Sequence, residues 1–298
     1  MKIGNAPCSW GVLEFDENAP VPLYKEILEE MAETGYEGTE LGPWGYFPTE
    51  PAQLKGMLHG YSLELVAAFV PVPFSEASAH EEGAAEALRI AELLSDVTGA
   101  EALIVLADDN GKIPVRVQKA GRIENEDSLT TAQWKTFGKG VDVVAARVFE
   151  ETGLRSVFHH HCAGYVETPK EIEILLDITN PDSVGLCFDT GHYRYGGGDP
   201  LAGMAKFSKR IRHIHFKDVD PAVLDDSIKQ RWDYFTSVQN GIFCELGSGN
   251  VQFPEIVKLL PELQQASWII VEQDILKQSD SPFRSAKNNR VYLKQLAL

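Results

Sequence analysis

The chain has 298 residues, 44% of them hydrophobic and 24% charged, which is an ordinary globular composition and argues against a largely disordered chain. Its 44 acidic residues outnumber its 27 Lys and Arg residues, and the net charge of −17 argues against nucleic acid or an anionic membrane as a partner. It shows no leader pattern, no apolar run near the roughly 18 residues of a membrane helix and no CxxC pair among its four cysteines, so we expect a soluble, cytoplasmic protein with reduced thiols.

Short apolar, β-branched runs alternate along the chain with longer segments of helical periodicity. The runs predict eight strands, at residues 2–6, 38–41, 63–70, 102–106, 156–160, 184–189, 211–217 and 268–272. The other segments predict helices at residues 22–34, 51–60, 79–94, 131–152, 168–178, 200–208, 253–265 and from about 282 onward. This alternation implies parallel strands with helices packed outside them.

Eight strand and helix units in a chain of this length are typical of a (β/α)8 TIM barrel, an α/β fold, so we expect residues 1–298 to form one barrel domain. A doubly wound sheet would show a Gly-rich turn, and no GxGxxG follows any predicted strand. Two long loops, residues 107–130 and 218–252, follow strands at the end where barrels build active sites. They are interpreted as lids or subunit contacts, which would fit a homo-oligomer, or as variable surface insertions.

Histidines gather in one part of the sequence. Six of the eight fall between His159 and His215, and each lies at or just beyond the end of a predicted strand. Because side chains alternate across a strand, His159 and His161 are expected to share a face, while His160 points the other way. Two imidazoles would then enter the mouth of the barrel.

The next three strands add further polar side chains at the same rim: Asp189 and His192 after the sixth strand, His213, His215 and Lys217 on the seventh, and Glu272 at the end of the eighth. Mn²⁺, Co²⁺ and Zn²⁺ accept this mixture of imidazole and carboxylate, so the sequence predicts a divalent metal centre. A carboxylate buried without a partner is costly, which favours a functional role for Asp189 and Glu272. His213 is as readily a core or supporting residue, and His192 and Lys217 could merely cap loops.

Several motifs occur in an order that resembles the myo-inosose-2 dehydratase group of the xylose isomerase-like barrels. They are NAPCSWG, GTELG, HHHCAG, VGLCFDTGH, RHIHFKDV, NGIF, ELGSGNVQF and WIIVEQD. The similarity spans nearly the whole chain, and DTGH, HxHFKD and VEQD form its most specific part. The resemblance implies a metal-dependent enzyme acting on a small sugar or polyol.

In those barrels a divalent metal is typically held by Glu, Asp, His and Glu from the fifth to eighth strands. These positions correspond here to His159, Asp189, His215 and Glu272. This chain departs from the pattern on the fifth strand, where many relatives have Glu-Asn-His and it has three histidines. The ligand from that strand is therefore His159, His161 or a water in place of either, and His159 is preferred.

The same departure bears on the reaction. Isomerases and epimerases of the superfamily use two facing glutamates as proton shuttles, and here only Glu272 is present. The resemblance therefore implies a dehydratase that removes the proton next to the ketone of an inosose, of the 2-keto-myo-inositol type, and then eliminates water. His161, His192 and Lys217 are the candidate acid and base groups, together with Glu272, and the histidines rank ahead of the lysine.

Trp10, Glu40 and His213 are the candidates for contacts with the substrate, although core packing accounts for the tryptophan about as well. Three other functions remain open at this point. A metal-dependent isomerase or epimerase shares the fold, the metal and the substrate class. A DNA-repair enzyme resembling endonuclease IV is disfavoured by the charge of −17. A non-catalytic sugar-binding or scaffold protein would have no reason to retain a metal.

Overall fold

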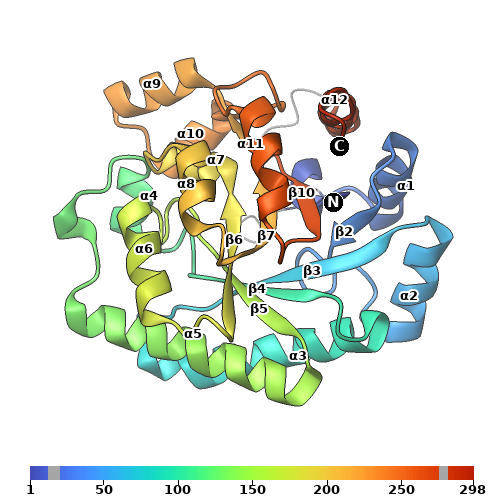
Figure 1. Ribbon diagram of the computed structural model, residues 1–298, viewed down its shortest axis with the longest axis horizontal. Helices are drawn as coiled ribbons and strands as arrows, with labels where there is room; N and C mark the ends of the chain where they lie inside the picture. The colour runs from blue at the N-terminus through green and yellow to red at the C-terminus, as the bar shows by residue number, and fades with distance from the viewer. Residues whose placement is uncertain (13–20, 275–280) are drawn as a thin grey trace.

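The predicted strands form a closed barrel of parallel strands in a computed structural model that describes residues 1–12, 21–274 and 281–298. Around the barrel the strands follow the order β1, β10, β7, β6, β5, β4, β3, β2 (Figure 1). Their bounds are β1 (Lys2–Asn5), β2 (Gly38–Glu40), β3 (Glu64–Pro71), β4 (Leu103–Ala107), β5 (Arg155–His159), β6 (Val184–Asp189), β7 (Ile211–Phe216) and β10 (Trp268–Val271). The TIM-barrel prediction is confirmed, and each strand begins and ends within one residue of its predicted bounds.

Helices cover the outside of the barrel, with α3 and α5 packed against each other below the strands and α12 beside α1 (Figure 1). They are α1 (Tyr24–Thr34), α2 (Pro51–Gly60), α3 (His80–Thr98), α5 (Thr131–Thr152), α6 (Pro169–Ile178), α8 (Pro200–Phe207), α11 (Phe253–Leu259) and α12 (Pro282–Gln295). None of the helices in the described ranges is both long and apolar enough to cross a bilayer.

Local sequence signals explain where several helices begin and end. Thr130 and Thr168 each accept a hydrogen bond from the backbone N–H three residues on, which starts α5 and α6. Gly35 ends α1 at a φ of 87°, a conformation that suits glycine. The helix expected at residues 253–265 was predicted too long, because Pro261 cannot donate to the preceding turn, and the chain tightens into a 3₁₀ turn at Leu260–Glu262.

The two long loops contain structure of their own and pack on each other beside the barrel mouth. The first holds α4 (Pro114–Lys119), and the second holds α9 (Pro221–Gln230), α10 (Tyr234–Gln239) and the antiparallel pair β8 (Asp218–Val219) and β9 (Phe243–Cys244). Arg122 of the first loop donates to the backbone oxygens of Ser227 and Trp232 in the second. The loops share a small hydrophobic core that includes Ala120, Tyr195, Leu224 and Tyr234. Their roles as lids or subunit contacts stay predictions.

Sequence periodicity did not reveal one short helix, α7 (Thr190–Tyr195), which starts directly at the end of β6. Asp189 caps it by accepting the backbone N–H of His192 at 2.7 Å. A Cβ built on Gly191 would lie 2.6 Å from Cγ of Lys217, so glycine lets α7 approach β7 closely. This packing brings Asp189, His192 and Lys217 together at the mouth of the barrel.

Candidate active site

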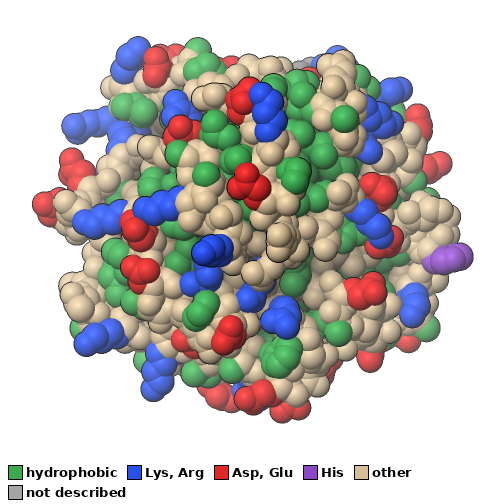
Figure 2. Space-filling model, in the orientation of Figure 1, with side chains coloured by type: hydrophobic (Ala, Val, Ile, Leu, Met, Phe, Trp, Pro, Cys, Tyr) green, Lys and Arg blue, Asp and Glu red, His purple; other side chains and the backbone are tan. Residues whose placement is uncertain are grey.

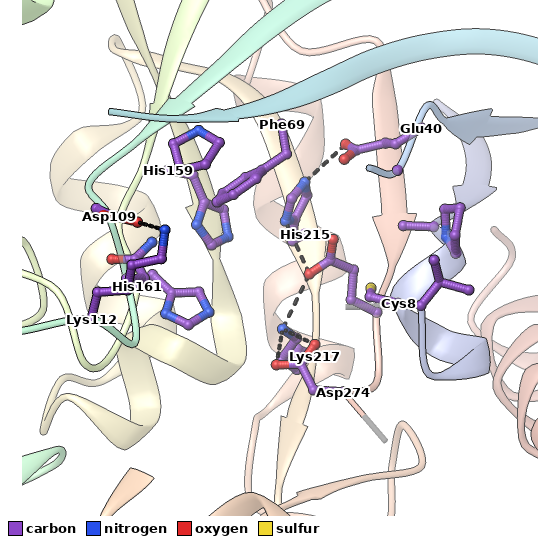
Figure 3. A pocket seen from close by; sticks show the side chains of 17 residues that line it. Cys8, Glu40, Phe69, Asp109, Lys112, His159, His161, His215, Lys217 and Asp274 are labelled. Atoms are coloured by element: carbon purple, nitrogen blue, oxygen red, sulfur yellow. Dashed lines mark hydrogen bonds and ion pairs between the residues drawn. The ribbon is translucent and has the colours of Figure 1, made fainter. Parts of the chain in front are cut away.

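A pocket opens at the carboxyl ends of the strands, where the sequence predicted the site. Apolar side chains form part of its wall, including Ala6, Pro7, Phe69 and Pro71. Its polar lining residues are Cys8, Glu40, Asp109, Asn110, Lys112, His159, His161, His215, Lys217, Glu272 and Asp274 (Figure 3). The pocket thus joins an apolar wall to a dense group of titratable side chains.

Four of the predicted metal ligands meet within this group. Donor atoms of His159, Asp189, His215 and Glu272 all lie within 4.8 Å of one another, and all four residues are buried. Oδ2 of Asp189 is 3.6 Å from Nε2 of His159 and 3.8 Å from Nδ1 of His215. Nδ1 of His215 is 3.3 Å from Oε2 of Glu272. The four side chains come from the ends of the neighbouring strands β5, β6, β7 and β10.

The hydrogen bonding of these atoms fits a divalent cation. Both ring nitrogens of His159, Oδ2 of Asp189 and Nδ1 of His215 are buried and have no hydrogen-bond partner among the described residues. Burial also holds the pKa of His159 well below its usual range, so the ring is the neutral form that binds metals. A cation held by these residues would satisfy the unpaired atoms together. Cys187 also lies close to His159 and His215, but burial raises the pKa of its thiol to about 12.

Glu40 orients His215 from behind. Its Oε1 accepts from Nε2 of His215 at 3.1 Å (Figure 3). It also accepts from Nε2 of His213 at 2.7 Å. Burial raises the pKa of the Glu40 carboxyl, but the two histidines outweigh it and hold that pKa at about 2. Burial lowers the pKa of His215, but neighbouring acidic groups that include Glu272 and Glu40 outweigh it and raise that pKa well above its usual value, so Nδ1 carries a proton when no cation is bound. A cation would displace this proton, and His215, with its other hydrogen on Nε2, would then offer Nδ1 as a ligand.

Lys217 stands beside the four donors as a buried cation. Its Nζ lies 3.1 Å from Oε2 of Glu272 and 3.1 Å from each carboxylate oxygen of Asp274 (Figure 3). Burial lowers the pKa of Lys217, but Asp274 and Glu272 outweigh it and raise that pKa well above its usual value. Lys217 is therefore an ammonium group, paired with Glu272 and Asp274, in the lining of the pocket.

The backbone around Cys162 sets different proton positions on His161 and His192. The carbonyl oxygen of Cys162 can only accept, so Nδ1 of His161 carries the hydrogen and Nε2 has a lone pair, 3.4 Å from the Tyr234 hydroxyl. The N–H of Cys162 donates to Nδ1 of His192 at 3.3 Å, which leaves the hydrogen of that ring on Nε2. Burial lowers the pKa of both rings, that of His161 to about 3, so both are neutral.

The hydrogen on Nε2 of His192 lies near Asp274. The distance from Nε2 to Oδ2 of Asp274 is 3.8 Å, and Nζ of Lys217 is 3.1 Å from the same nitrogen. Nε2 of His192 and Nζ of Lys217 both carry hydrogens, so they do not bond to each other. We attribute their close approach to the Asp274 carboxylate, which is near both. His192 is fully buried and is not among the residues that line the pocket, whereas His161 is.

The structure turns His160 away from the pocket, as strand alternation predicted. Its ring packs against Phe188 and Tyr193, and its Nε2 accepts the backbone N–H of Asp189 at 3.1 Å. His160 therefore supports the strand that carries Asp189.

Two of the expected substrate contacts are corrected by the structure. Trp10 is 4% exposed in the hydrophobic core and donates its Nε1 hydrogen to Glu30 at 2.6 Å, and it does not line the pocket. His213 lies two residues before His215 on β7, deeper in the barrel. It donates to Glu40 there and does not line the pocket. Glu40 does line the pocket.

Sequence reasoning gave no role to several residues that the structure brings to the pocket. Asp274 belongs to the quoted VEQD motif but received no role, and Cys8 belongs to NAPCSWG. Asp109, Asn110 and Lys112 lie in a loop that was interpreted as a lid, a subunit contact or a variable surface insertion. The polar run of residues 108–111 directly after an apolar strand was the signal that could have identified them.

Comparisons with known proteins agree with this geometry. A family model described as xylose isomerase-like TIM barrel matches residues 28–294. The chain is 33% identical over 295 residues to an inosose dehydratase of Geobacillus kaustophilus strain HTA426, which covers 99% of this chain and 94% of the relative. It is 31% identical over 293 residues to an inosose dehydratase of Lacticaseibacillus casei, which covers 98% of this chain and 96% of the relative.

Solved structures share the fold at lower identity. One is a probable 3-DHS dehydratase, AsbF, involved in petrobactin synthesis in Bacillus anthracis, with a TM-score of 0.73, 15% identity and 99% of each chain covered. Another is the IolI protein with a bound zinc atom, with a TM-score of 0.72, 15% identity, and 99% of this chain and 98% of the other covered. At such identities these likenesses establish the barrel fold alone.

Proposed function

The chain belongs to the xylose isomerase-like TIM barrel family, and on this premise we propose that it is a metal-dependent dehydratase acting on a cyclic polyol ketone of the inosose type. The observation that carries the proposal is the arrangement of the site. Four buried metal donors lie close to a neutral imidazole, His161, which lines the same pocket and keeps its lone pair on Nε2. The full-length similarity to inosose dehydratases supports the choice of substrate.

We assign the metal ligands as His159, Asp189, His215 and Glu272, with a divalent cation such as Mn²⁺, Co²⁺ or Zn²⁺. The unpaired donor atoms described above support this assignment, and the zinc atom in the structural neighbour supports a divalent ion. When bound, such a cation supplies positive charge that stabilises the enolate oxygen formed when a proton leaves the carbon next to a ketone.

The protein's own groups account for the two proton movements. His161 takes the proton from the carbon next to the ketone at Nε2, because the Cys162 carbonyl keeps the hydrogen of that ring on Nδ1. Lys217 gives a proton from Nζ to the departing β-hydroxyl, because it lines the pocket as an ammonium group. The C–H bond and the C–O bond break, a C=C bond forms, water leaves, and the enol tautomerises to a diketone. Asp274 holds Lys217 in place by accepting its hydrogens at both carboxylate oxygens.

The strand-five histidine favours elimination over epimerisation. An epimerase of the two-carboxylate type needs a second carboxylate facing Glu272, and position 159 holds an imidazole instead. A sugar or inosose isomerase or epimerase would form the same enolate and return a proton to it. The two reactions therefore differ in their products.

The test is a product assay with defined metal content. The protein is stripped of metal and refilled with Mn²⁺, Co²⁺ or Zn²⁺ singly, and each form is incubated with a panel of inososes and ketoses. We expect loss of water from an inosose, seen as a new diketone absorbance, that depends on the added ion. Isomers formed at constant mass would replace the proposal with the isomerase alternative. A protein that holds no divalent ion and changes no substrate would be a binding or scaffold protein.

We further propose that the chain is a single domain that acts in the cytoplasm on a small molecule, without nucleic acid. The net charge of −17 supports the last point. No disulfide joins the four cysteines, all of which lie in the described ranges, and this supports a reducing compartment. A homo-oligomer remains a prediction that sedimentation of the purified protein would test.

A further inference from the structure

The loop after β4 reaches the pocket, but the proposed mechanism uses none of its side chains. Asp109, Asn110 and Lys112 from this loop all line the pocket (Figure 3). Asp109 and Lys112 are partners of each other, at 3.1 Å, and the lysine side chain is 68% exposed. Asn110 differs from these two residues, because its amide nitrogen has no hydrogen-bond partner among the described residues.

The backbone that carries Asn110 is fixed by hydrogen bonds to the loop after β5. The N–H of Gly111 donates to the oxygen of Ala163 at 3.1 Å, and the N–H of Tyr165 donates to Oδ2 of Asp108 at 2.9 Å. Asp108 is 2% exposed, so the second of these bonds lies inside the protein. The position of Asn110 is therefore set before any ligand binds, which is a requirement for selective recognition.

Gly164 makes room for the Asn110 side chain. A Cβ built on Gly164 would overlap Oδ1 of Asn110, which therefore rests against the glycine backbone. The other end of the amide, Nδ2, is enclosed and donates to no atom in the described part of the protein. A donor enclosed in this way is costly unless a ligand or an ordered water satisfies it. Since Asn110 lines the pocket, a rotation of its amide would bring Nδ2 to a ligand there.

We propose that Asn110 is a specificity-determining residue that donates from Nδ2 to a ring hydroxyl of the polyol ketone, one that takes no part in the elimination. The inference rests on the proposed function for the identity of the substrate. The metal donors and Lys217 engage the reacting oxygens, and Asn110 reads a hydroxyl from the β4 side of the pocket. A ketone without that hydroxyl would leave the amide unsatisfied and would bind more weakly.

Three variants test the inference on the metal-loaded protein: Asn110→Ala, Asn110→Asp and Gly164→Ala. Asn110→Ala removes the donor, Asn110→Asp replaces it with an acceptor of the same shape, and Gly164→Ala keeps the asparagine but displaces it. Each is expected to raise KM for the inosose about 3- to 15-fold, the value of one hydrogen bond, while kcat stays within about twofold. The matched control is Asn180→Ala, at an exposed turn before β6, which should leave both constants unchanged.

A panel of deoxy analogues, each lacking one ring hydroxyl, identifies the contact. For one analogue, the wild type and Asn110→Ala should have the same KM, because the missing hydroxyl and the missing donor remove one interaction. An unchanged KM in Asn110→Ala and Gly164→Ala would overturn the inference and mean that water satisfies the amide. A loss of kcat or of bound metal at unchanged KM would also overturn it, because the residue would then act on the site rather than on the substrate.

Failure of the proposed function has a different signature. If the wild type eliminates water from no inosose, binding of myo-inositol and of the ketose panel is measured by calorimetry. A dissociation constant that rises in the three variants and stays constant in Asn180→Ala then supports the inference although the dehydratase proposal has failed. Equal affinities in all variants, or no binding of any polyol, overturn both.

Discussion

Asp189 shows how one side chain serves several neighbours at once. Its Oδ1 caps α7, and its backbone N–H donates to His160. Its Oδ2 faces His159 and His215 and has no hydrogen-bond partner in the part of the chain that the structure describes. Because the cap and the backbone fix the carboxylate, the unpaired oxygen has a defined direction. The same residue thus links the end of a strand, the start of a helix and the proposed cation.

Loss of either carboxylate should empty the metal site. We predict that Asp189→Asn and Glu272→Gln each lower metal occupancy and activity at least about tenfold, because each removes a formal charge from a buried cation site. Occupancy is measured by elemental analysis of the purified variants, with circular dichroism to verify folding. His160→Ala is the comparison, and it should retain more metal than either, since its ring points away from the donors. A greater loss of metal in His160→Ala would contradict the assignment.

His161 should be needed for proton transfer but not for metal binding. We predict that His161→Ala lowers kcat by at least about a hundredfold while metal content stays near that of the wild type, because general-base catalysis by a positioned side chain typically contributes this much. The measurement combines steady-state kinetics with elemental analysis. His59→Ala, an exposed histidine on α2, is the control. If His161→Ala lost its metal instead, the strand-five ligand would be His161 and not His159.

At the scale of elements, the loop after β4 is tied to the start of α6 by a buried ion pair. Arg116 on α4 donates to Oε1 and Oε2 of Glu171 at 2.9 and 2.8 Å, and neither side chain is more than 3% exposed. Nε of Arg116 also donates to the backbone oxygen of Gly164. This network fixes the position of the loop after β4 relative to the loop after β5. It thereby fixes Asn110 relative to His161.

Breaking this ion pair from one side should be costly. We predict that Arg116→Met destabilises the protein by about 3–5 kcal/mol, because it leaves the Glu171 carboxylate buried without its partner. Urea unfolding at constant pH measures the change. The double variant Arg116→Met with Glu171→Gln should be less destabilised than Arg116→Met alone. If it is destabilised by the sum of the two single changes, the charges do not interact as described.

A second carboxyl in these loops should make stability depend on pH. Glu167 is buried and accepts the N–H groups of Gly121 and Ala163, so it joins the β4 and β5 loops. Burial, with a smaller contribution from the Glu171 carboxylate, raises the pKa of Glu167 to about 7. Arg116 and the two N–H groups favour the charged form but do not outweigh burial. The folded state therefore binds this proton more tightly than the unfolded state does.

Stability therefore falls as the pH rises, because the folded state holds this proton more tightly. The contribution of Glu167 to stability is full below about pH 4.5, falls as the pH rises toward 7, and is lost above it, by about 3 kcal/mol in all. We predict that Glu167→Gln gains in stability relative to the wild type between pH 5 and pH 7.5, as measured by urea unfolding. Glu92→Gln, an exposed glutamate on α3, should show no such gain. A constant difference between wild type and Glu167→Gln across this range would refute the prediction.

Strands and metal donors could be predicted from the sequence, because strand periodicity and parallel pairing put residues at strand ends on one rim. How far along a strand a residue lies relative to the pocket could not be predicted. His213 and His215 share a face, but only the register of β7 against its neighbours places one in the pocket and the other below it. The environment of Trp10 depends on contacts with α1, far along the chain, and could not be read locally. The polar run at residues 108–111 marks the loop that holds Asn110, but only the structure distinguishes Asn110 from its neighbours, by its unsatisfied nitrogen.

At the scale of the whole molecule, the barrel separates stability from chemistry. Apolar residues fill its interior below the pocket, including Val66, Val105, Val157 and Ile270, and a larger core lies between strands and helices. The outer surface carries many charged side chains of both signs (Figure 2). Buried titratable groups instead gather at the carboxyl ends of the strands. His159 and Lys217 line the pocket there, and Asp189 lies directly behind them. This distribution lets the proposed reaction depend on a few side chains without placing them in the core that holds the fold.

If this site eliminates water from an inosose, the product formed in D₂O has a different mass from any isomer of the substrate. The metal-loaded protein is incubated with 2-keto-myo-inositol in D₂O, with a metal-stripped sample as the control, and the products are analysed by mass spectrometry. We expect a product lighter by one water, apart from exchanged deuterium, formed only when the metal is present. An isomer that retains all its oxygen atoms, with deuterium on the carbon next to the ketone and no diketone, would contradict it.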